Sequence, residues 1–522
     1  MLNNCKVLFF AIAGFLLISC DQHTIGENSS KGSAYYLSNS GNDENSGSID
    51  SPWKTIAKLN TIDLNTGDTI FFAAGQTFEG TLQLESSDSG TAENPVVFTS
   101  MGSDKASIYA GNFSAIVISF AKNISVKNLH LIGSGRKEGN TQSGIVIQNN
   151  SRSVIIDSLD VEGFQKSGVL VYASSDIIIE RVYAHNNGAA GISVAGSSTK
   201  LDNKNILIRN CFAENNPGDP TKLDNHSGNG IIVGLCTNVT IEYCSATNNG
   251  WDMPRIGNGP VGIWAYEADS VTIQHCISYR NKTSKGGEDG GGFDLDGGVT
   301  NTIIQYCLSY ENEGSGFGIF QYAGASAWKN NTVRFNISEN DGLVSRAHCG
   351  LFIWNGSDDD NQFTDFYCYN NVIYNTDGNA IYFDEYSKRK RFKYYNNIFV
   401  AKDKLTKGLS VNDVFAGNNW WSLADGFNMN DEKDFNVWVN QTGQEKLNDV
   451  VRGVNLNPGF ESTSTNNITN PLELTSFIKY KLPSTSLLRT QGIDLKTELG
   501  IETHDKDFNQ NTLPSKGIGA SF

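Results

Sequence analysis

The 522-residue chain is poor in charge, and the charge that it carries is mostly acidic. Charged residues make up 18% of the chain, and 56 Asp and Glu outnumber 40 Lys and Arg, which gives a net charge of −16. A nucleic-acid binder needs a basic surface to neutralise phosphates, so this balance argues against nucleic acid as a partner. The sequence also contains no phosphate-binding glycine loop, zinc-ligand motif or nucleophile elbow.

A long apolar run is also missing from the N-terminal segment, where Lys6 precedes 12 apolar residues, Val7 to Ile18. This run is too short to cross a bilayer but suits the core of a signal peptide. It ends in Leu-Ile-Ser-Cys, which resembles a bacterial lipoprotein signal whose cleavage leaves Cys20 as a lipid-modified N-terminus. The sequence therefore predicts an exported lipoprotein, anchored to the outer membrane through Cys20, with a signal peptide over 1–19 and a tether over 20–33. An ordinary secretory signal with an incidental Cys20 is the alternative.

Turn-forming residues, in contrast, are plentiful. The chain has 53 Gly and only 10 Pro, and its hydrophobic content of 39% argues against both a disordered chain and a polytopic membrane protein. This composition suits many short strands and does not suit long helices. No segment of helical length and periodicity separates the β-branched runs of the central region.

The middle of the chain repeats itself at intervals of 23 to 35 residues. A short minimum period with variable insertions is typical of a solenoid that carries loops on some of its edges. Short parallel strands that coil around one axis form a β-helix, for which we predict first coils and an N-terminal cap over 34–110, a core over 111–405, and terminal coils with a C-terminal cap over 406–522. One aligned position runs through Leu129, Leu159, Val182, Cys211, Cys244, Cys276, Cys307, Asn336, Asn371 and Asn397.

This repeated position predicts two interior ladders. Cys211, Cys244, Cys276 and Cys307 are expected to stack as buried free thiols at about 4.8 Å per coil, because side chains that point the same way have poor disulfide geometry. A metal site is the alternative interpretation, but one ligand per coil in a line does not surround an ion. The Asn residues that follow in the same column are expected to form a buried amide ladder.

Both ends of the chain carry family-like motifs. The segments Ala34–Ser38, Gly41–Asp43, Ser51–Ile56 and Gly67–Ile70, together with Gly517–Ala520, resemble those of secreted bacterial right-handed parallel β-helix proteins. This resemblance implies an all-β, right-handed parallel β-helix and a superfamily rich in polysaccharide lyases and glycoside hydrolases.

Two cap structures are predicted from local residues. Ser51 as N-cap and Pro52 at the first helical position predict a short helix over 52–60 that closes the first coil. Trp420, Trp421 and Trp438 indicate a packed C-terminal cap.

The connections between coils lengthen in the centre of the chain, at 217–229, 251–261, 282–291 and 343–349. Insertions at the same point of successive coils stack into one wall. We expect this wall to border the strands that follow the insertions, each of which opens with Gly.

Within these strands, Asp294 and Asp296 carry the clearest chemistry. Alternation turns Phe293 and Leu295 inward, so both Asp side chains should point outward, about 6.6 Å apart along the strand. Two adjacent carboxyl groups with unequal pKa values suit an acid and a base or nucleophile in glycosidic-bond cleavage, and Asp289 on the preceding loop adds acidity. A Ca²⁺ site formed by the three Asp residues and a merely solvated strand edge are the alternatives.

Aromatic side chains are predicted to point outward beside the carboxylates and to form a platform for sugar rings: Trp264, Tyr266, Phe320, Phe352 and Trp354. Lys285, Arg346 and His348 lie on cleft-side loops, as do His226 and Arg255, and they would suit proton abstraction from a uronate. The sequence thus favours a glycoside hydrolase that uses paired Asp residues and requires no cofactor. A polysaccharide lyase acting with Ca²⁺ and a non-catalytic glycan-binding lipoprotein are the alternatives.

Overall fold

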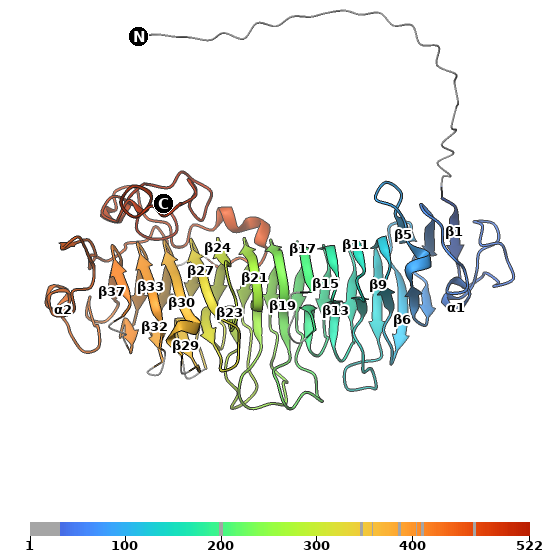
Figure 1. Ribbon diagram of the computed structural model, residues 1–522, viewed down its shortest axis with the longest axis horizontal. Coiled ribbons are helices and arrows are strands. Elements are labelled where there is room, and N and C mark those ends of the chain that lie inside the picture. Colours follow the sequence, from blue (N-terminus) through green and yellow to red (C-terminus); the bar gives the residue numbers. More distant parts are fainter. Residues whose placement is uncertain are drawn as a thin grey trace, which may run out of the picture. The chain divides into compact units, whose positions relative to one another are not determined.

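The computed structural model describes residues 32–522 except 198–201, 345–347, 358, 385–387, 403, 409–411 and 463–465. The signal peptide over 1–19 and Cys20 therefore lie outside the described residues. The described chain is a solenoid of short parallel strands, as Figure 1 shows, so the predicted all-β, right-handed parallel β-helix is confirmed. No helix within the described residues is long and apolar enough to cross a membrane.

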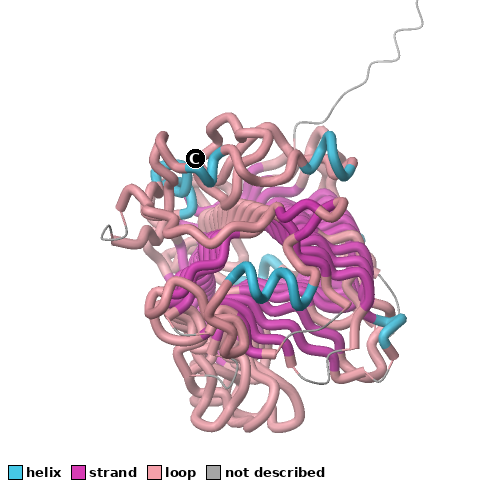
Figure 2. The backbone as a smooth tube through the Cα atoms, turned by 90° about the vertical axis from the view of Figure 1, so that its left-hand side faces the viewer, coloured by secondary structure: helices cyan, strands magenta, loops and turns pink. Residues whose placement is uncertain are grey.

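Each coil contributes strands to three faces, which Figure 2 shows around the interior. Two faces belong to one 24-stranded sheet and the third is a 13-stranded sheet, and β19 and β21 are long enough to run through both faces of the larger sheet. The face that follows the long loops, called the cleft face, holds β4 (Leu82–Leu84), β7 (Ile116–Ser119), β10 (Ile145–Gln148), β13 (Ser167–Tyr172), β16 (Ala190–Ala195), the first halves of β19 (Asn229–Glu242) and β21 (Val261–Gln274), β23 (Gly291–Leu295), β26 (Phe317–Gln321), β29 (Cys349–Asn355), β32 (Asn379–Phe383) and β35 (Thr406–Lys407).

The back face holds β1 (Ala34–Leu37), β2 (Thr69–Ala73), β5 (Val96–Met101), β8 (Lys122–Lys127), β11 (Arg152–Asp157), β14 (Ser175–Glu180), β17 (Asn203–Arg209), the second halves of β19 and β21, β24 (Ile303–Gln305), β27 (Trp328–Arg334), β30 (Phe363–Tyr369), β33 (Lys390–Tyr395) and β36 (Val414–Ala416). The 13-stranded flank sheet holds β3 (Thr77–Glu79), β6 (Ala106–Gly111), β9 (Leu129–Gly133), β12 (Asp160–Glu162), β15 (Tyr183–His185), β18 (Phe212–Glu214), β20 (Ser245–Thr247), β22 (Ile277–Tyr279), β25 (Leu308–Tyr310), β28 (Ile337–Glu339), β31 (Val372–Asn375), β34 (Ile398–Ala401) and β37 (Asn419–Ser422).

Alternation of side chains along each strand fills the interior. In β14, Ile177 and Ile179 are fully buried while Ile178 between them is not. The predicted thiol ladder is part of this interior, because Cys211, Cys244, Cys276 and Cys307 are all fully buried and unpaired. Each sulfur contacts backbone carbonyls, as Cys244 Sγ does with Glu242 O at 3.3 Å.

Two amide ladders run along the stack. The predicted ladder is confirmed: Asn336 Nδ2 donates to Asn371 Oδ1 at 3.0 Å, and Asn371 Nδ2 donates to Asn397 Oδ1 at 2.9 Å. The second ladder lies in the Asn-rich turns that precede the long loops. It consists of Asn187, Asn216, Asn249, Asn281 and Asn312, and it ends on Asp341.

The turn ladder explains why the strands of the cleft face open with glycine. A Cβ on Gly262 would lie 2.6 Å from Asn281 Nδ2, and one on Gly292 would lie 2.9 Å from Asn312 Nδ2. Only a residue without a side chain leaves room for the buried amides at these positions. The ladder therefore fixes where the strands of the cleft face begin from β13 to β26.

The N-terminal helix is shorter than the predicted 52–60. Helix α1 spans Ile56–Leu59, and its N-cap is Thr55, whose side chain accepts from Lys58 N. Ser51 instead pairs with Ser48 in an isolated bridge, so the predicted cap at Ser51 is wrong. Ile56 and Leu59 are buried in the core and close the first coil.

At the other end, strands still stack as far as β37, and helix α2 (Phe435–Thr442) places Trp438 against Trp420, with ring centroids 6.1 Å apart. Residues 466–522 do more than cap the end. They run back along the outer side of the flank sheet (Figure 1), where they cover Ile277, Leu308 and Ile337 with apolar side chains. This segment also contains helix α3 (Leu495–Leu499), and the short β38 (Lys446–Leu447) and β39 (Val450–Val451) precede it as an antiparallel pair.

Candidate active site

The floor of the site is formed by two rows of outward side chains on the cleft face. Parallel register places Trp264, Asp294 and Gly318 side by side on β21, β23 and β26. The second row lies two residues further along each strand and places Phe320 beside Trp354. Asp296 joins it next to Tyr266, since Asp296 N donates to Ala265 O at 2.9 Å. The inward neighbours Phe293 and Leu295 are fully buried, as alternation predicted.

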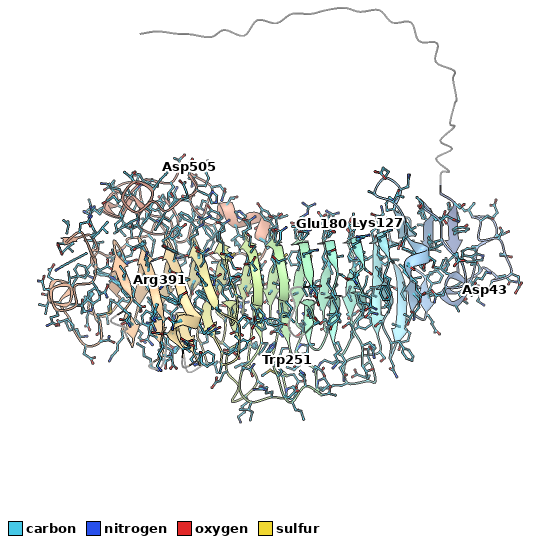
Figure 3. The ribbon with its side chains drawn as sticks, in the orientation of Figure 1. Asp43, Lys127, Glu180, Trp251, Arg391 and Asp505 are labelled. Carbon is cyan, nitrogen blue, oxygen red and sulfur yellow. The ribbon has the colours of Figure 1, made fainter. Side chains whose placement is uncertain are left out.

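Loops over 217–228, 251–260 and 282–290 form the wall beside this floor, at the lower side of Figure 1. They hold one another in place: Gly259 N donates to Asp289 Oδ2 at 2.8 Å, and Ser284 Oγ donates to Arg255 O at 2.9 Å. Trp251, which Figure 3 labels on this wall, donates from Nε1 to Asn215 Oδ1 at 2.9 Å. The floor and the wall enclose a cavity of about 570 Å³.

Asp294 is the most buried carboxyl group of the cavity, with 3% of its surface exposed. Its Oδ1 atom is buried and has no hydrogen-bond partner, which is costly unless the group is protonated or meets a ligand. Burial, followed by the negative charges of Asp296 and Asp289, raises the pKa of Asp294 well above its ordinary value. Asp294 is therefore suited to hold a proton at neutral pH and to donate it.

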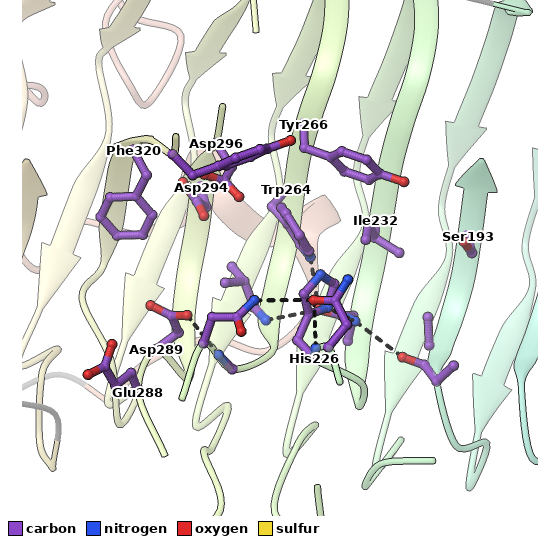
Figure 4. A pocket seen from close by; sticks show the side chains of 18 of the residues that line it. Ser193, His226, Ile232, Trp264, Tyr266, Glu288, Asp289, Asp294, Asp296 and Phe320 are labelled. Carbon is purple, nitrogen blue, oxygen red and sulfur yellow. Dashed lines mark hydrogen bonds between the residues drawn. The ribbon is translucent and has the colours of Figure 1, made fainter. Parts of the chain in front are cut away.

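Asp296 is less enclosed and more easily ionised. Burial raises its pKa to about 7, and a hydrogen bond from the backbone N–H of Gly297 acts in the opposite direction. Figure 4 shows both carboxyl groups together, between Phe320 and Tyr266. The pair thus combines an acid that retains its proton with a neighbour that loses its proton near neutral pH, which is the division of roles that glycosidic cleavage requires.

The predicted aromatic platform lines the cavity, but it is less exposed than expected. Trp264 has 3% of its surface exposed. Its Nε1 donates to Asn229 Oδ1 at 3.0 Å, and the ring of His226 packs edge-on against it, with ring centroids 4.9 Å apart. Phe320 is likewise mostly buried against Phe352 and Trp354. A wall loop thus covers Trp264 and the rings of the floor cover Phe320, so part of the aromatic set is packing rather than open platform.

Of the basic residues expected for lyase chemistry, His226 lines the cavity, whereas Lys285, Arg255 and His348 do not. Lys285 is exposed on its loop and does not line the cavity. His348 is also not part of the lining, and its Nε2 lies 3.9 Å from Asp377 Oδ2. Arg346 lies outside the described residues. The described cavity lining instead has Lys222 as its one Lys or Arg, against four acids: Glu288, Asp289, Asp294 and Asp296.

Several lining residues were not singled out from the sequence. Asn229 and Tyr322 are the most informative, since Asn229 holds Trp264 and Tyr322 lies close to Gly297 after the Asp pair. Their positions follow from loop packing. The only sequence signal for them is the series of insertions, which predicts a wall at this edge of the strands. Among the described residues, no group of three or more His, Cys, Asp or Glu is arranged to hold a metal ion.

Comparison with known proteins adds a family. A family model described as "Pel9A-like, right handed beta helix region" matches residues 35–348. The search of curated proteins gave no match. Solved structures that resemble the chain include a GH136 lacto-N-biosidase from Eubacterium ramulus, with 17% identity, a TM-score of 0.49, and coverage of 72% of this chain and 68% of that one.

Two further similar structures differ in what their names say of them. Pectate lyase Pel9A has 15% identity and a TM-score of 0.46, with coverage of 94% of this chain and 97% of that one. PfbA, a surface adhesin of Streptococcus pneumoniae, has 12% identity and a TM-score of 0.45, with coverage of 67% and 84%. At these identities the similarity concerns the fold.

Proposed function

Because the chain belongs to the Pel9A-like right-handed β-helix family, whose coils here carry an acidic cavity, we propose that it is a carbohydrate-active enzyme, specifically a glycoside hydrolase. The observation that carries this proposal is the Asp294–Asp296 pair. One carboxyl group is buried and unpaired, and its neighbour ionises more easily.

In the proposed reaction, protonated Asp294 gives its proton to the glycosidic oxygen as the bond to the departing sugar breaks. Ionised Asp296 acts on the anomeric carbon, either by activating a water molecule or as the nucleophile. The strand spacing of about 6.6 Å lies near the lower edge of the separation that leaves room for a water molecule in inverting enzymes. Side-chain rotamers change the distance between the carboxyl groups in either direction, so the configuration of the first product decides between the two courses.

The charge of the cavity supports an uncharged sugar chain as the substrate. Four carboxyl groups face one Lys in the described lining, and a uronate carboxylate would be repelled there. Aromatic rings such as Tyr266 and Trp354 offer apolar faces to the C–H faces of neutral sugars. Lyase chemistry needs a cationic partner for the uronate, and the candidates Lys285 and His348 lie outside the cavity lining.

The test uses a panel of neutral and uronate-containing polysaccharides. We expect new reducing ends on a neutral glycan without an ultraviolet-absorbing unsaturated sugar, and a loss of turnover of about 10²-fold or more in Asp294→Asn and Asp296→Asn. An unsaturated product would identify a lyase instead, and binding without cleavage would identify a glycan-binding protein.

The same variants test whether the three Asp residues hold Ca²⁺. If Asp289, Asp294 and Asp296 hold Ca²⁺, all three Asn variants should lose activity and regain part of it with excess Ca²⁺, and chelation should inactivate the unmodified protein. The hydrolase proposal expects activity that chelation leaves unchanged.

We also propose that the protein is held at the outer membrane through a lipid on Cys20. The supporting observation is the apolar run that ends in Leu-Ile-Ser-Cys. Cys20→Ala should abolish lipid labelling and release the protein from the membrane fraction, and unchanged membrane association would contradict the proposal.

A further inference from the structure

We propose that His226 presents its Nε2–H to the cavity as a neutral hydrogen-bond donor for a sugar hydroxyl, and that Asn229 fixes this tautomer. The inference rests on the proposed function in one respect only, which is that the ligand is a sugar. His226 lies on the wall loop over 217–228, lines the cavity and is partly exposed there (Figure 4).

The orientation of the Asn229 amide follows from its partners. Its Oδ1 accepts from Val261 N at 3.2 Å and from Trp264 Nε1 at 3.0 Å. Both partners can only donate, so the oxygen of the amide must lie on this side. The Nδ2 group therefore points the other way, where it meets Ala189 O at 3.2 Å and His226 Nδ1 at 3.1 Å.

The protonation of His226 follows from that orientation. Because Asn229 Nδ2 can only donate, His226 Nδ1 must accept, and the single proton of the neutral ring must sit on Nε2. A protonated ring would set an N–H of His226 against the N–H of Asn229. Among the described residues the structure records no partner for Nε2.

The charges around the ring agree with a neutral imidazole. Burial, followed by the positive charges of Arg255 and Lys222, lowers the pKa of His226 to about 4. Glu288 and Asp289 line the same cavity, and negative charge favours a protonated ring, but the net shift of the His226 pKa is downward. The ring thus stays uncharged over the pH range in which the Asp pair is expected to work.

The position of His226 places this donor where a bound sugar can meet it. Its ring packs edge-on against Trp264, which is the neighbour of Asp294 in strand register. His226 and Asp294 therefore both neighbour Trp264 and line the same cavity. A fixed neutral donor matches a hydroxyl group and offers no charge to a carboxylate, which agrees with an uncharged glycan as the ligand.

The tautomer is tested without any substrate. The measurement uses the full chain labelled with ¹⁵N-histidine, and His226→Gln assigns the signal. We expect Nδ1 to be unprotonated and Nε2 to be protonated, with no titration between about pH 5 and about pH 9, a range that brackets the ordinary histidine pKa. A proton on Nδ1, or titration near neutral pH, would overturn the proposal.

Asn229→Asp is the matched control. One carboxylate oxygen can still accept from Trp264 and Val261, but the other now faces Nδ1, so the proton should move to Nδ1 and the pKa of His226 should rise. A variant that leaves the tautomer unchanged would show that Asn229 does not fix it.

The sugar contact is tested with cellohexaose, xylohexaose and mannohexaose as probes on Asp294→Asn. A probe that binds should shift the Nε2–H signal, and His226→Phe should weaken its binding about tenfold, whereas His226→Gln, which keeps a donor, should lose less. A bound probe that leaves the signal unchanged would overturn the contact. If no glycan binds or is cleaved, the proposed function and the sugar contact both fail, while the histidine spectrum still decides the tautomer.

Discussion

Asp294 on β23 faces Gly318 on β26, and a Cβ on Gly318 would lie 3.0 Å from Asp294 Oδ1. The same Cβ would lie 2.7 Å from the ring of Phe320. The missing side chain therefore keeps open the space into which the unpaired oxygen of Asp294 points.

Gly318→Ala should close this space. A methyl group at these distances forces Asp294 or Phe320 to move, and displacement of a catalytic acid by about 1 Å can cost on the order of 10²-fold in rate. We expect turnover on the identified glycan to fall at least tenfold while the melting temperature changes little. Full activity in Gly318→Ala would show that the reacting oxygen lies elsewhere. Ser193→Ala, at a lining position that Figure 4 shows on the side of the cavity away from Asp294, is the control and should stay active.

Asp294→Asn should lose activity and gain stability at neutral pH. The folded state raises the pKa of Asp294, so between the ordinary and the raised value the folded protein binds more protons than the unfolded chain, and stability falls as pH rises through this window. The amide introduced at this position does not titrate, so the substitution removes this loss of stability.

The measurement is the melting temperature of both proteins as a function of pH. The variant should melt on the order of 2 °C or more above the parent at pH 7, and the two should converge at pH values below the ordinary Asp pKa. A lower melting temperature at pH 7 would contradict the proposed burial of an unpaired carboxyl group.

Asp289→Asn should shift the pH profile rather than abolish activity. Asp289 raises the pKa of both Asp294 and Asp296 by its charge, so its removal should lower both. Because Asp296 must be ionised, the acid limb of kcat/KM, expected near the Asp296 value of about 7, should move to lower pH. An unshifted limb with activity reduced about 10²-fold would make Asp289 a participant in the reaction itself.

Periodicity explains which parts of the structure were predictable. The inward thiols and amides, and the outward direction of Asp294 and Asp296, follow from a two-residue alternation that each coil repeats. The loops carry no such period. Their packing depends on single contacts such as Gly259 with Asp289, which is why the burial of Trp264 and the exclusion of Lys285 from the cavity were not foreseen.

The C-terminal segment illustrates the same limit. Its path along the flank sheet depends on apolar residues of separate coils and on pairs that are far apart in sequence. One such pair is buried, with Lys479 Nζ 2.6 Å from Glu339 Oε1. Sequence spacing does not reveal a contact between residues 140 positions apart.

Trp264→Ala and Trp354→Ala should separate packing from binding. Trp264 is buried and hydrogen-bonded to Asn229, so its loss should reduce the free energy of unfolding by about 3–5 kcal/mol. Trp354 is more exposed, and its loss should mainly weaken glycan binding by about 1 kcal/mol. Denaturant unfolding and calorimetric binding measure the two effects, and equal destabilisation by both variants would contradict the assignment. Trp264→Phe, which keeps the ring packing, should be intermediate.

The thiol ladder makes a prediction about reactivity. Burial raises the pKa of Cys211, Cys244 and Cys276 well above the ordinary value, and these thiols are sealed in the interior, so they should react with an alkylating reagent far more slowly than an exposed thiol. Peptide mass spectrometry should find them unmodified in the native protein and fully modified after denaturation. Leu223→Cys, at a position with 69% exposure on the wall loop, supplies a fast-reacting control in the same sample. If Cys244 and Cys276 reacted as fast as this control, the inward direction of the ladder would be wrong. The strand register that turns Asp294 and Asp296 into the cavity would then lose its support, because the same coils carry both.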